Sequence, residues 1–462
     1  MQPLNPRPLP RATPADPALH RAGRVIDLAL QAYVYGYPLV ALRRTRNLLT
    51  SEDVGIGAPV NAFLHVERLM TPRSREVVKP NNDTLYSSAF LDLREGPLLL
   101  TVPDTQGRYY SLTLFDAYTN AFAYVGRRTT GTRAGRYVIT GPGHRGPLPE
   151  LPVLTAPTDS VWLLGRTLVD GPHDLDAACD TIRRYTLTTV RGTPPPTAHH
   201  HGPVLSPQHL GAGGIEFFDE VCAALALDPP PDADRPVLDL IAELGIGPGC
   251  TPSREVTDPV VRAALDTVGV SGDALLNLAP GAAPAEPGST RQGIRQRDGW
   301  SYYLSTGSYD QRYLIRAGVA QQGIGAVHPD EALYIGARAD AQDRPLDGRR
   351  RYLLRFEPGR LPPVDAFWSV TAYDREQYLM DNPLGRYSVG DRTPRLVYGD
   401  DGSLELYIQH DEPVQGPSNW LPVGPGRFEL TVRCYQPHSR LLDGRYTLPP
   451  LVLLDDGPAQ SA

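Results

Sequence analysis

The chain has 462 residues with a net charge of −7 at pH 7, and 41% of its residues are hydrophobic, which is ordinary for a globular protein. The acidic balance leaves no basic footprint for nucleic acid, so we expect no nucleic-acid partner. Lys79 is the only lysine among 45 basic residues, which excludes P-loop nucleotide hydrolases, protein kinases and Ser-x-x-Lys enzymes, because the residues around Lys79 fit none of their motifs.

The N-terminal part of the chain favours neither export nor a membrane span. Residues 1–18 are rich in proline and lack the apolar core of a signal peptide. The apolar stretch at residues 26–42 is interrupted by polar side chains and by Pro38. The four cysteines are far apart, as expected for free thiols in a reducing compartment. We therefore expect a cytoplasmic protein without a membrane partner.

Helical periodicity comes first along the chain and is followed by strands. Residues 19–36 have apolar side chains at helical spacing, and Gly36-Tyr37-Pro38 predicts the end of that helix before a second one at residues 39–49. Short alternating segments bounded by Gly, Pro or Asp then predict a β-sandwich up to residue 169. Its expected strands are residues 84–93, 98–102, 108–116, 121–127, 136–140 and 160–166.

The rest of the chain is predicted to be helical first and then β again. Residues 175–189 predict a helix, residues 191–210 a proline-rich hinge, and residues 214–278 a group of amphipathic helices. After Trp300, strands are expected at residues 332–334, 352–356, 366–374, 403–409 and 427–435. The expected segments are a flexible tail (1–24), a helix plus β-sandwich (25–190), the hinge and helical insert (191–299), a second β-domain (300–455) and a tail (456–462).

One seven-residue unit occurs in both β regions. Tyr110–Asp116 and Trp368–Asp374 share the pattern aromatic-Ser-aliphatic-Thr-aliphatic-aromatic-Asp. The alternation predicts a strand with one buried face that ends on a carboxylate. Two related β-domains, each with an Asp at a matching rim, are therefore expected.

Several longer motifs resemble known families. Lys79-Pro80-Asn81-Asn82-Asp83-Thr84-Leu85-Tyr86 resembles the DUF1254 family. The C-terminal half resembles the DUF1214 family, on the motifs Phe367–Asp374, Asp381-Asn382-Pro383, Arg386-Tyr387 and Asn419-Trp420-Leu421-Pro422. The resemblance implies a mainly β fold with a helical insert: an N-terminal β-sandwich and a C-terminal jelly roll. It implies no reaction.

The Asn81-Asn82-Asp83-Thr84 segment has two interpretations. Asn and Asp side chains accept hydrogen bonds from nearby backbone N–H groups, so the segment fits an Asx-turn that starts a strand. Alternatively, Asn81 or Asn82 points into a cleft with Asp83 as acid, base or ligand. Lys79 beside them would then lower a carboxylate pKa or bind an anion.

The carboxylates that end the repeated strands also have two interpretations. If Asp116 and Asp374 face one cleft between the domains, they are suited to general acid and general base work. If each caps its own turn, they are structural. Asn120 lies just beyond Asp116 and belongs to the same candidate site.

Arginines and aromatic residues supply candidate binding groups. Arg127 and Arg386 are suited to anions, because a guanidinium binds carboxylate or phosphate bidentately, although a salt bridge is at least as common. Tyr86, Trp368 and Trp420 are suited to a ligand-binding wall, although aromatic residues more often fill a core.

Metal ligation is weakly supported by the sequence. His199-His200-His201 lies in a Pro- and Thr-rich loop, and His410 precedes Asp411 after an expected strand. There is no H-E-x-x-H motif. No cofactor is predicted, and a divalent metal ion is the open alternative.

The sequence therefore favours an enzyme that acts on a small polar or amphipathic molecule in an interdomain cleft, by acid–base or hydrolytic chemistry. The candidate catalytic residues are Asp83, Asp116 and Lys79. The candidate substrate-binding residues are Asn81, Asn82, Tyr86, Asn120, Arg127, Trp368, Asp374, Asn382, Arg386, Asn419 and Trp420. The alternatives are a non-catalytic ligand- or carbohydrate-binding protein, and a jelly-roll assembly protein that forms a homo-oligomer.

Overall fold

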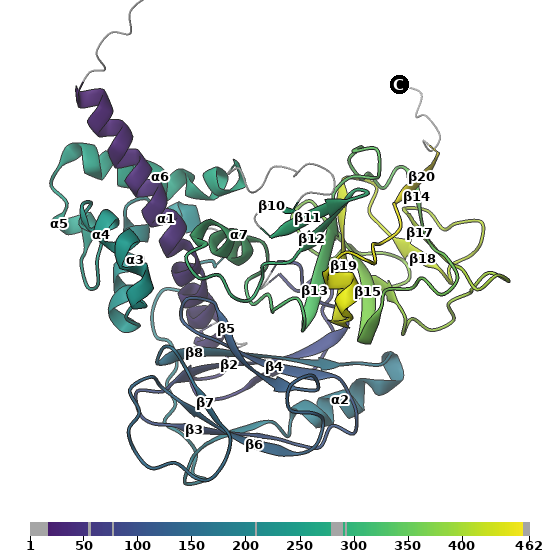
Figure 1. The fold of residues 1–462 in the computed structure, drawn as a ribbon, viewed down its shortest axis with the longest axis horizontal. Coiled ribbons are helices and arrows are strands. Elements are labelled where there is room, and N and C mark those ends of the chain that lie inside the picture. Colours follow the sequence, from purple (N-terminus) through teal and green to yellow (C-terminus); the bar gives the residue numbers. More distant parts are fainter. Residues whose placement is uncertain are drawn as a thin grey trace, which may run out of the picture. The chain divides into compact units, whose positions relative to one another are not determined.

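The computed structural model describes residues 17–53, 57–75, 78–207, 210–278, 290–291 and 293–455 (Figure 1). It divides into two compact units, each described by itself below. The first unit comprises Met1–Tyr37 and His209–Leu275, and the second comprises Pro38–Gln208 and Leu276–Ala462.

The helix α1 runs without interruption through the boundary between the units. It spans Pro17–Thr50 and contains Pro38 in its interior. The prediction of two helices separated at Gly36-Tyr37-Pro38 was therefore wrong, and residues 17–24, expected in a tail, are helical. A proline in a helix removes one hydrogen bond and costs about 3 kcal/mol, which burial of Tyr37, Leu39 and Val40 offsets.

By length and composition, α1 is the one helix among the described residues that meets the criterion for a membrane span. However, 72% of its most apolar window is buried inside the protein, and buried core helices pass the same test. The cytoplasmic location and the lack of a membrane partner stay predictions.

The helical insert expected in the middle of the chain is confirmed. The first unit contains η2 (Leu210–Gly213), α3 (Glu216–Leu227), η3 (Asp232–Asp234), α4 (Arg235–Ala242), α5 (Pro252–Glu255) and most of α6 (Pro259–Leu278). Within it, Phe217 of α3 stacks on Tyr33 of α1 with ring centroids 4.4 Å apart. Tyr35 donates a hydrogen bond to the Asp234 carboxylate at 3.0 Å.

The first β region of the second unit is a sandwich, called here the N-terminal sandwich. Its antiparallel five-stranded sheet has the order β1 (Leu64–Val66), β2 (Thr84–Asp92), β8 (Ser160–Leu168), β4 (Tyr110–Phe115) and β5 (Ala121–Gly126). The four-stranded sheet has the order β7 (Val153–Thr155), β6 (Gly135–Thr140), β3 (Leu98–Val102) and β9 (Thr186–Thr189). Leu85, Leu112 and Leu163 of the first sheet share one core with Leu100 and Ile139 of the second.

The second β region is also built from two sheets with a common core, called here the C-terminal sandwich. The seven-stranded sheet has the order β10 (Thr290–Arg291), β11 (Ile294–Arg297), β12 (Trp300–Tyr303), β13 (Ala332–Ala337), β19 (Phe428–Pro437), β15 (Val364–Asp374) and β16 (Ser388–Gly390). The four-stranded sheet has the order β18 (Trp420–Pro422), β17 (Leu404–Gln409), β14 (Arg351–Phe356) and β20 (Val452–Asp455). The mainly β fold is therefore confirmed, whereas the jelly-roll topology stays a prediction.

The two sandwiches pack against each other within the second unit. Phe90 and Trp162, on the outer face of the five-stranded sheet, join one apolar cluster with Phe367 and Tyr435, on the outer face of the seven-stranded sheet. Sheets of this kind usually leave one face to solvent, but here both outer faces are partly covered. Groups on these faces therefore lie at an interior boundary.

Short helices complete the second unit. They are η1 (Pro172–Asp174), α2 (Leu175–Ile182), α7 (Tyr313–Gly323) and α8 (Ser439–Leu442). The helix expected at residues 175–189 is shorter than predicted, because Thr186–Thr189 forms β9 and pairs with β3. Three threonines in four residues favour a strand, since β-branched side chains pack well on a pleated surface.

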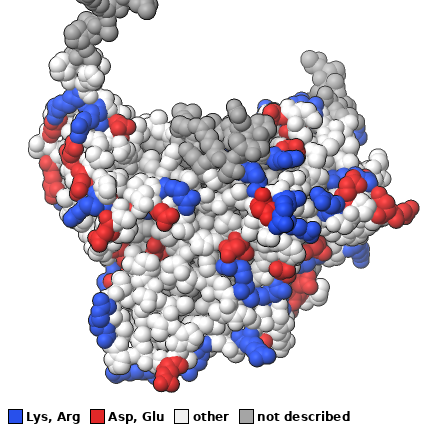
Figure 2. Space-filling model, in the orientation of Figure 1, with Lys and Arg blue, Asp and Glu red and all other residues white. Residues whose placement is uncertain are grey.

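Charged side chains are unevenly distributed over the face in Figure 2. On the face in Figure 2, acidic and basic groups are intermixed, and much of the N-terminal sandwich below α7 carries neither.

Candidate ligand-binding cavity

A cavity of about 480 Å³ lies in the second unit, between the outer faces of the two sandwiches. Its volume is in the range of about 300–1,000 Å³ that is usual for small-molecule sites. Strands β2 and β8 form one wall, strands β12, β13 and β19 another, and helix α7 with the end of α1 closes the rest.

Most of the cavity wall is apolar. Trp162 and Leu164 project from alternate positions of β8, and Leu49 lies near the end of α1. One face of α7 is turned to the cavity, with Ile315 and Val319 four residues apart. This part of the cavity suits a hydrocarbon or aromatic group.

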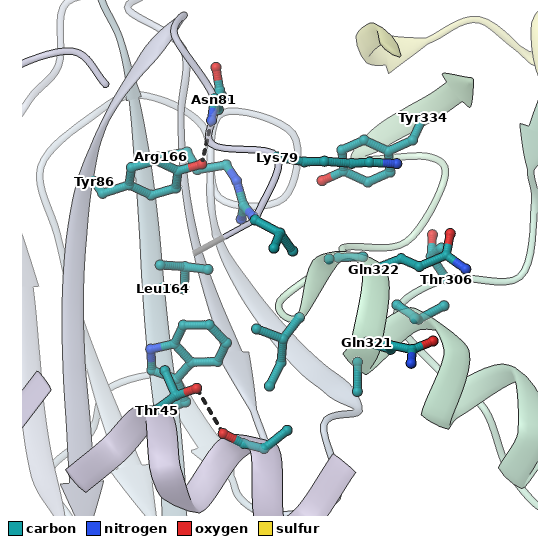
Figure 3. A pocket seen from close by; sticks show the side chains of 18 of the residues that line it. Thr45, Lys79, Asn81, Tyr86, Leu164, Arg166, Thr306, Gln321, Gln322 and Tyr334 are labelled. Atoms are coloured by element: carbon teal, nitrogen blue, oxygen red, sulfur yellow. Dashed lines mark hydrogen bonds between the residues drawn. The ribbon is translucent and has the colours of Figure 1, made fainter. Parts of the chain in front are cut away.

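Polar side chains gather on the two sheets that face each other across the cavity. The polar lining residues include Lys79, Asn81, Tyr86, Arg166, Tyr334, Arg433 and Tyr435. Figure 3 shows Tyr86 and Arg166 on the strands of the N-terminal sandwich, with Tyr334 and Gln322 across from them. An apolar cavity with a few convergent polar groups is the usual form of a ligand site.

Asn81 lines the cavity and also forms the expected Asx-turn. Its Oδ1 accepts a hydrogen bond from Asp83 N at 2.6 Å. Its Nδ2 donates to Tyr435 Oη at 2.6 Å, which connects the two sandwiches. Its backbone N donates to Tyr86 Oη at 3.3 Å (Figure 3). Asn81 therefore positions two phenol groups of the lining.

Lys79 is held in the lining by an ion pair with Glu429 of β19. The distance between Lys79 Nζ and Glu429 Oε1 is 3.0 Å, and Arg338 binds Oε2 of the same carboxylate at 2.8 Å. Burial lowers the pKa of Lys79, Glu429 counteracts this, and Arg338 and Arg433 lower it further. The backbone of Lys79 has a φ of 49°, a left-handed conformation that is uncommon outside glycine.

Two arginines of the lining are buried and hydrogen-bonded to neutral groups. Arg166 and Arg433 are 7% and 4% exposed. Arg166 Nη2 donates to Gly325 O at 3.0 Å, while its Nη1 is buried without a hydrogen bond. Arg433 donates to Thr371 Oγ1 at 3.1 Å and to Lys79 O at 2.9 Å. Among the described residues, no ion pair with a carboxylate is formed by either guanidinium.

Asp83 does not line the cavity. Its Oδ2 accepts from Ser369 Oγ at 2.6 Å and its Oδ1 from Arg392 Nη2 at 3.0 Å. The side chain is 4% exposed, and both partners belong to the C-terminal sandwich. The candidate catalytic carboxylate is therefore a buried link between the sandwiches, and it does not meet Lys79 in the cavity.

Asp116 and Asp374 close two turns of the same kind. Asp116 Oδ1 accepts from the N–H groups of Tyr118 and Asn120, at positions i+2 and i+4. Asp374 Oδ1 accepts from Glu376 and Tyr378, which stand at the same two spacings. Neither aspartate lines the cavity.

Asp340 forms a third turn of this kind, although it lies outside the repeated unit. Its Oδ1 accepts from the N–H groups of Gln342 and Arg344, again at positions i+2 and i+4. The arrangement is therefore a recurrent turn, and the repeated unit marks a strand that ends in it.

Burial raises the pKa of Asp116 to about 6. A carboxyl with a raised pKa binds more protons in the folded state, so its contribution to stability falls as pH rises from about 4 through 6. The relevant quantity is the difference between the free energies of unfolding of wild type and of Asp116→Asn. We expect this difference, wild type minus variant, to fall by about 2 kcal/mol between pH 4 and 7. Urea denaturation at both pH values measures this, and a constant difference would show that Asp116 titrates normally.

Three candidates of the N-terminal sandwich are also engaged outside the cavity. Asn82 Nδ2 donates to Met70 O at 2.6 Å. Asn120 Oδ1 accepts from Tyr309 N at 3.1 Å. Arg127 donates to Gln436 Oε1 at 2.6 Å. None of the three lines the cavity.

The candidates of the C-terminal sandwich stabilise its loops and core. Asn382 Nδ2 donates to Arg386 O at 2.9 Å, and Arg386 donates to Trp420 O at 2.9 Å. Asn419 binds both the N–H and the carbonyl of Val397, at 2.8 and 2.6 Å. These polar motifs hold neighbouring loops together.

The two candidate tryptophans are buried by packing, as the alternative interpretation predicted. Trp368 is 2% exposed and belongs to the core of the C-terminal sandwich. Trp420 is 3% exposed, and its Nε1 donates to Gln409 O at 2.9 Å. The aromatic lining is formed instead by Tyr86 and Trp162, with tyrosines of β13 and β19.

No cluster of three or more His, Cys, Asp or Glu side chains suited to a metal ion is found in residues 17–53, 57–75, 78–207, 210–278, 290–291 and 293–455. His199 lies 3.3 Å from Glu52 through its Nε2, and His410 Nδ1 is 2.9 Å from Val423 O. Neither histidine lines the cavity.

Arg166 and Arg433 were missed by the sequence analysis, although each stands in an informative row of side chains. On β8, Arg166 follows Trp162 and Leu164 at every second position, so the three side chains share one face. On β19, Arg433 precedes the buried Tyr435 on one face. An arginine in a row of apolar strand residues is the signal that was available.

The fold and the cavity define a protein of two packed β-sandwiches with a helical insert and a cavity lined by cationic side chains. The sequence matches two families, "Protein of unknown function (DUF1254)" over residues 60–189 and "Protein of unknown function (DUF1214)" over residues 331–439. The chain is therefore a DUF1254/DUF1214 domain-containing protein, as the motifs predicted.

The fold is similar to solved structures whose descriptions name no activity. The crystal structure of the VPA0106 protein from Vibrio parahaemolyticus has a TM-score of 0.66 and 25% sequence identity, covering 93% of this chain and all of that one (100%). A putative uncharacterized protein from Burkholderia cenocepacia has a TM-score of 0.43 and 13% identity, over 96% of this chain and 91% of that one. No curated protein matches the chain.

Proposed function

We propose that the protein binds a small amphipathic molecule in the cavity between its sandwiches. One observation carries the proposal: a volume of about 480 Å³ has apolar walls and a polar region where arginine, lysine, tyrosine and asparagine side chains converge. Such a site contributes affinity through apolar burial and orientation through its few polar groups.

Filling the cavity tests the proposal. Gly318 lies on α7 in the cavity wall, and a Cβ atom at this position would meet no atom within 4 Å. Gly318→Leu places a side chain there and improves helix propensity by almost 1 kcal/mol. We expect it to weaken binding of N-phenyl-1-naphthylamine, a neutral dye that fluoresces in apolar sites, by about tenfold or more, while the protein stays folded.

The matched control is Gly23→Leu. Gly23 is an exposed glycine of α1, where an added Cβ atom would also meet no atom within 4 Å, and it does not line the cavity. This variant is expected to bind the dye as wild type does. If the dye binds both variants equally, it does not enter the cavity and the proposal fails.

The second candidate function is an enzyme that acts on the bound molecule by acid–base chemistry. The Lys79–Glu429 pair, with its 3.0 Å separation in the lining, favours it. A lysine whose pKa is lowered by burial exchanges a proton more readily near neutral pH. Lys79 Nζ would donate a proton to a group of the ligand, with Glu429 orienting the amine. Asp83 and Asp116 have no part in this version, because their oxygens are bound elsewhere.

A further inference from the structure

We infer that the ligand is an amphipathic oxyanion, a molecule whose anionic oxygen head is bound by Arg166 and Arg433 and whose apolar body lies against α7 and β8. The inference rests on the proposed function and names the class of molecule that the same cavity takes.

The buried charges of Arg166 and Arg433 form no ion pair with a carboxylate among the described residues, and Asp83 acts on Arg433 only as a nearby charge without a hydrogen bond. Removing a guanidinium from water is costly unless an anion or a full set of hydrogen bonds replaces the water. Arg166 and Arg433 are at least nine-tenths buried, and the hydrogen bonds described above go only to neutral groups. Within the same described part of the chain, Arg166 Nη1 is buried without a hydrogen-bond partner. An oxyanion in the cavity supplies what both side chains lack.

The carboxylates near the arginines are already bound by other cations, and Glu67, which also lines the cavity, is bound by Arg183. Asp83 is bound by Arg392 and Ser369. Glu429 is bound by Lys79 and Arg338. The polar region therefore keeps a net positive charge before a ligand arrives.

Tyrosines lie around the two arginines in the cavity lining. The Arg166 guanidinium lies 5.8 Å from the centre of the Tyr86 ring. Burial raises the pKa of Tyr435 well above its usual range, so this phenol stays neutral and does not compensate the arginines. Its oxygen accepts from Asn81, which leaves the phenol proton for a ligand oxygen.

The two parts of the cavity differ in charge and polarity. Guanidinium groups suit the oxygens of carboxylates and phosphates, whereas Trp162, Leu164, Ile315 and Val319 are apolar and the nearby lining residues Thr45, Thr306 and Gln321 are uncharged. The ligand is therefore charged at one end only.

Competition between molecules that differ only in their head group tests the inference. Octanoate, octylphosphonate and 1-octanol are used to displace N-phenyl-1-naphthylamine from the wild-type protein. We expect both anions to displace the dye with at least about tenfold higher affinity than the alcohol, which corresponds to about 1.4 kcal/mol. Arg166→Gln should reduce this preference to less than about threefold. Arg127→Gln, which changes an arginine outside the cavity, should leave it as in wild type.

The outcomes separate the inference from the function on which it rests. If Gly318→Leu blocks dye binding but the three competitors act equally on wild type, the cavity binds ligands and the oxyanion assignment is overturned. If the dye is insensitive to Gly318→Leu, the proposed function itself fails. The comparison of the three competitors on the wild-type protein tests the inference even if Arg166→Gln does not fold, because this comparison needs no variant.

Discussion

Replacing Asp83 by alanine is expected to lower the free energy of unfolding by about 3 kcal/mol, because it leaves the largely buried Arg392 guanidinium with only the Asp391 carboxylate, whose Oδ1 lies 3.5 Å from Arg392 Nε. Arg392 is 16% exposed at the side chain, and its Nη2 lies 3.0 Å from Asp83 Oδ1. The substitution also leaves Ser369 Oγ without its acceptor. Equilibrium denaturation in guanidinium chloride measures the loss.

Asp92→Ala is the matched control, at the other end of the strand that begins directly after Asp83. Asp92 pairs with Arg94 at 2.9 Å, but the two side chains are 26% and 32% exposed. More exposed pairs contribute about 0–1 kcal/mol, so this variant should stay close to wild type. If Asp83→Ala were as stable as Asp92→Ala, the carboxylate would not link the sandwiches, and a role in chemistry would need to be considered again.

The dense motif from Lys79 to Tyr86 shows which features of a site can be predicted from the sequence and which cannot. The motif was correctly singled out as unusual, and Lys79, Asn81 and Tyr86 line the cavity. Asp83 lies on the same segment but points to Ser369 and Arg392, which are 286 and 309 positions away in the chain. Local pattern identifies the segment, but only the packing of the second sandwich decides which side chain meets the cavity.

The longer strands of the fold were predictable because short apolar runs are bounded by Gly, Pro or Asp. The expected strands at residues 98–102 and 352–356 match β3 (Leu98–Val102) and nearly match β14 (Arg351–Phe356). Short edge strands such as β1 and β16 were missed, since three residues carry too little periodicity. The Pro38 error has another cause: burial of α1 outweighs a local helix-breaking signal.

The arginine site was out of reach for a different reason. Arg166 and Arg433 lie on strands of different sandwiches and converge only because the outer faces of two sheets pack together. No motif spans that distance in sequence. The alternation on β8 shows that Arg166 shares a face with Trp162, but it does not show that this face is covered by another sheet.

Glu429→Gln is expected to destabilise the protein by about 3 kcal/mol, whereas Lys79→Met should cost about 1 kcal/mol or less. The asymmetry follows from the composition of the cluster. Glu429 is the acid that Lys79 and Arg338 share, and Arg433 stands close enough to lower the pKa of Lys79. Removing the acid leaves three cations together, while removing the lysine leaves Glu429 with Arg338. Methionine keeps a Cβ atom at residue 79, so Lys79→Met leaves the strain from the φ of 49° unchanged.

The pH dependence of Glu429→Gln separates this charge effect from a packing defect. Without Glu429, the remaining influences on Lys79 are burial, Arg338 and Arg433, and all of them lower its pKa. A lysine with a lowered pKa binds fewer protons in the folded state, so stability rises as pH increases toward about 10.4, the ordinary pKa of lysine. The free energy of unfolding that Glu429→Gln loses relative to wild type should therefore be smaller at pH 10 than at pH 7 in urea denaturation. If the loss is instead a packing defect, adding Lys79→Met to Glu429→Gln will not reduce it. Equal losses for the two single variants would mean that Lys79 and Glu429 form an isolated pair, in which case Arg338 does not stabilise the carboxylate.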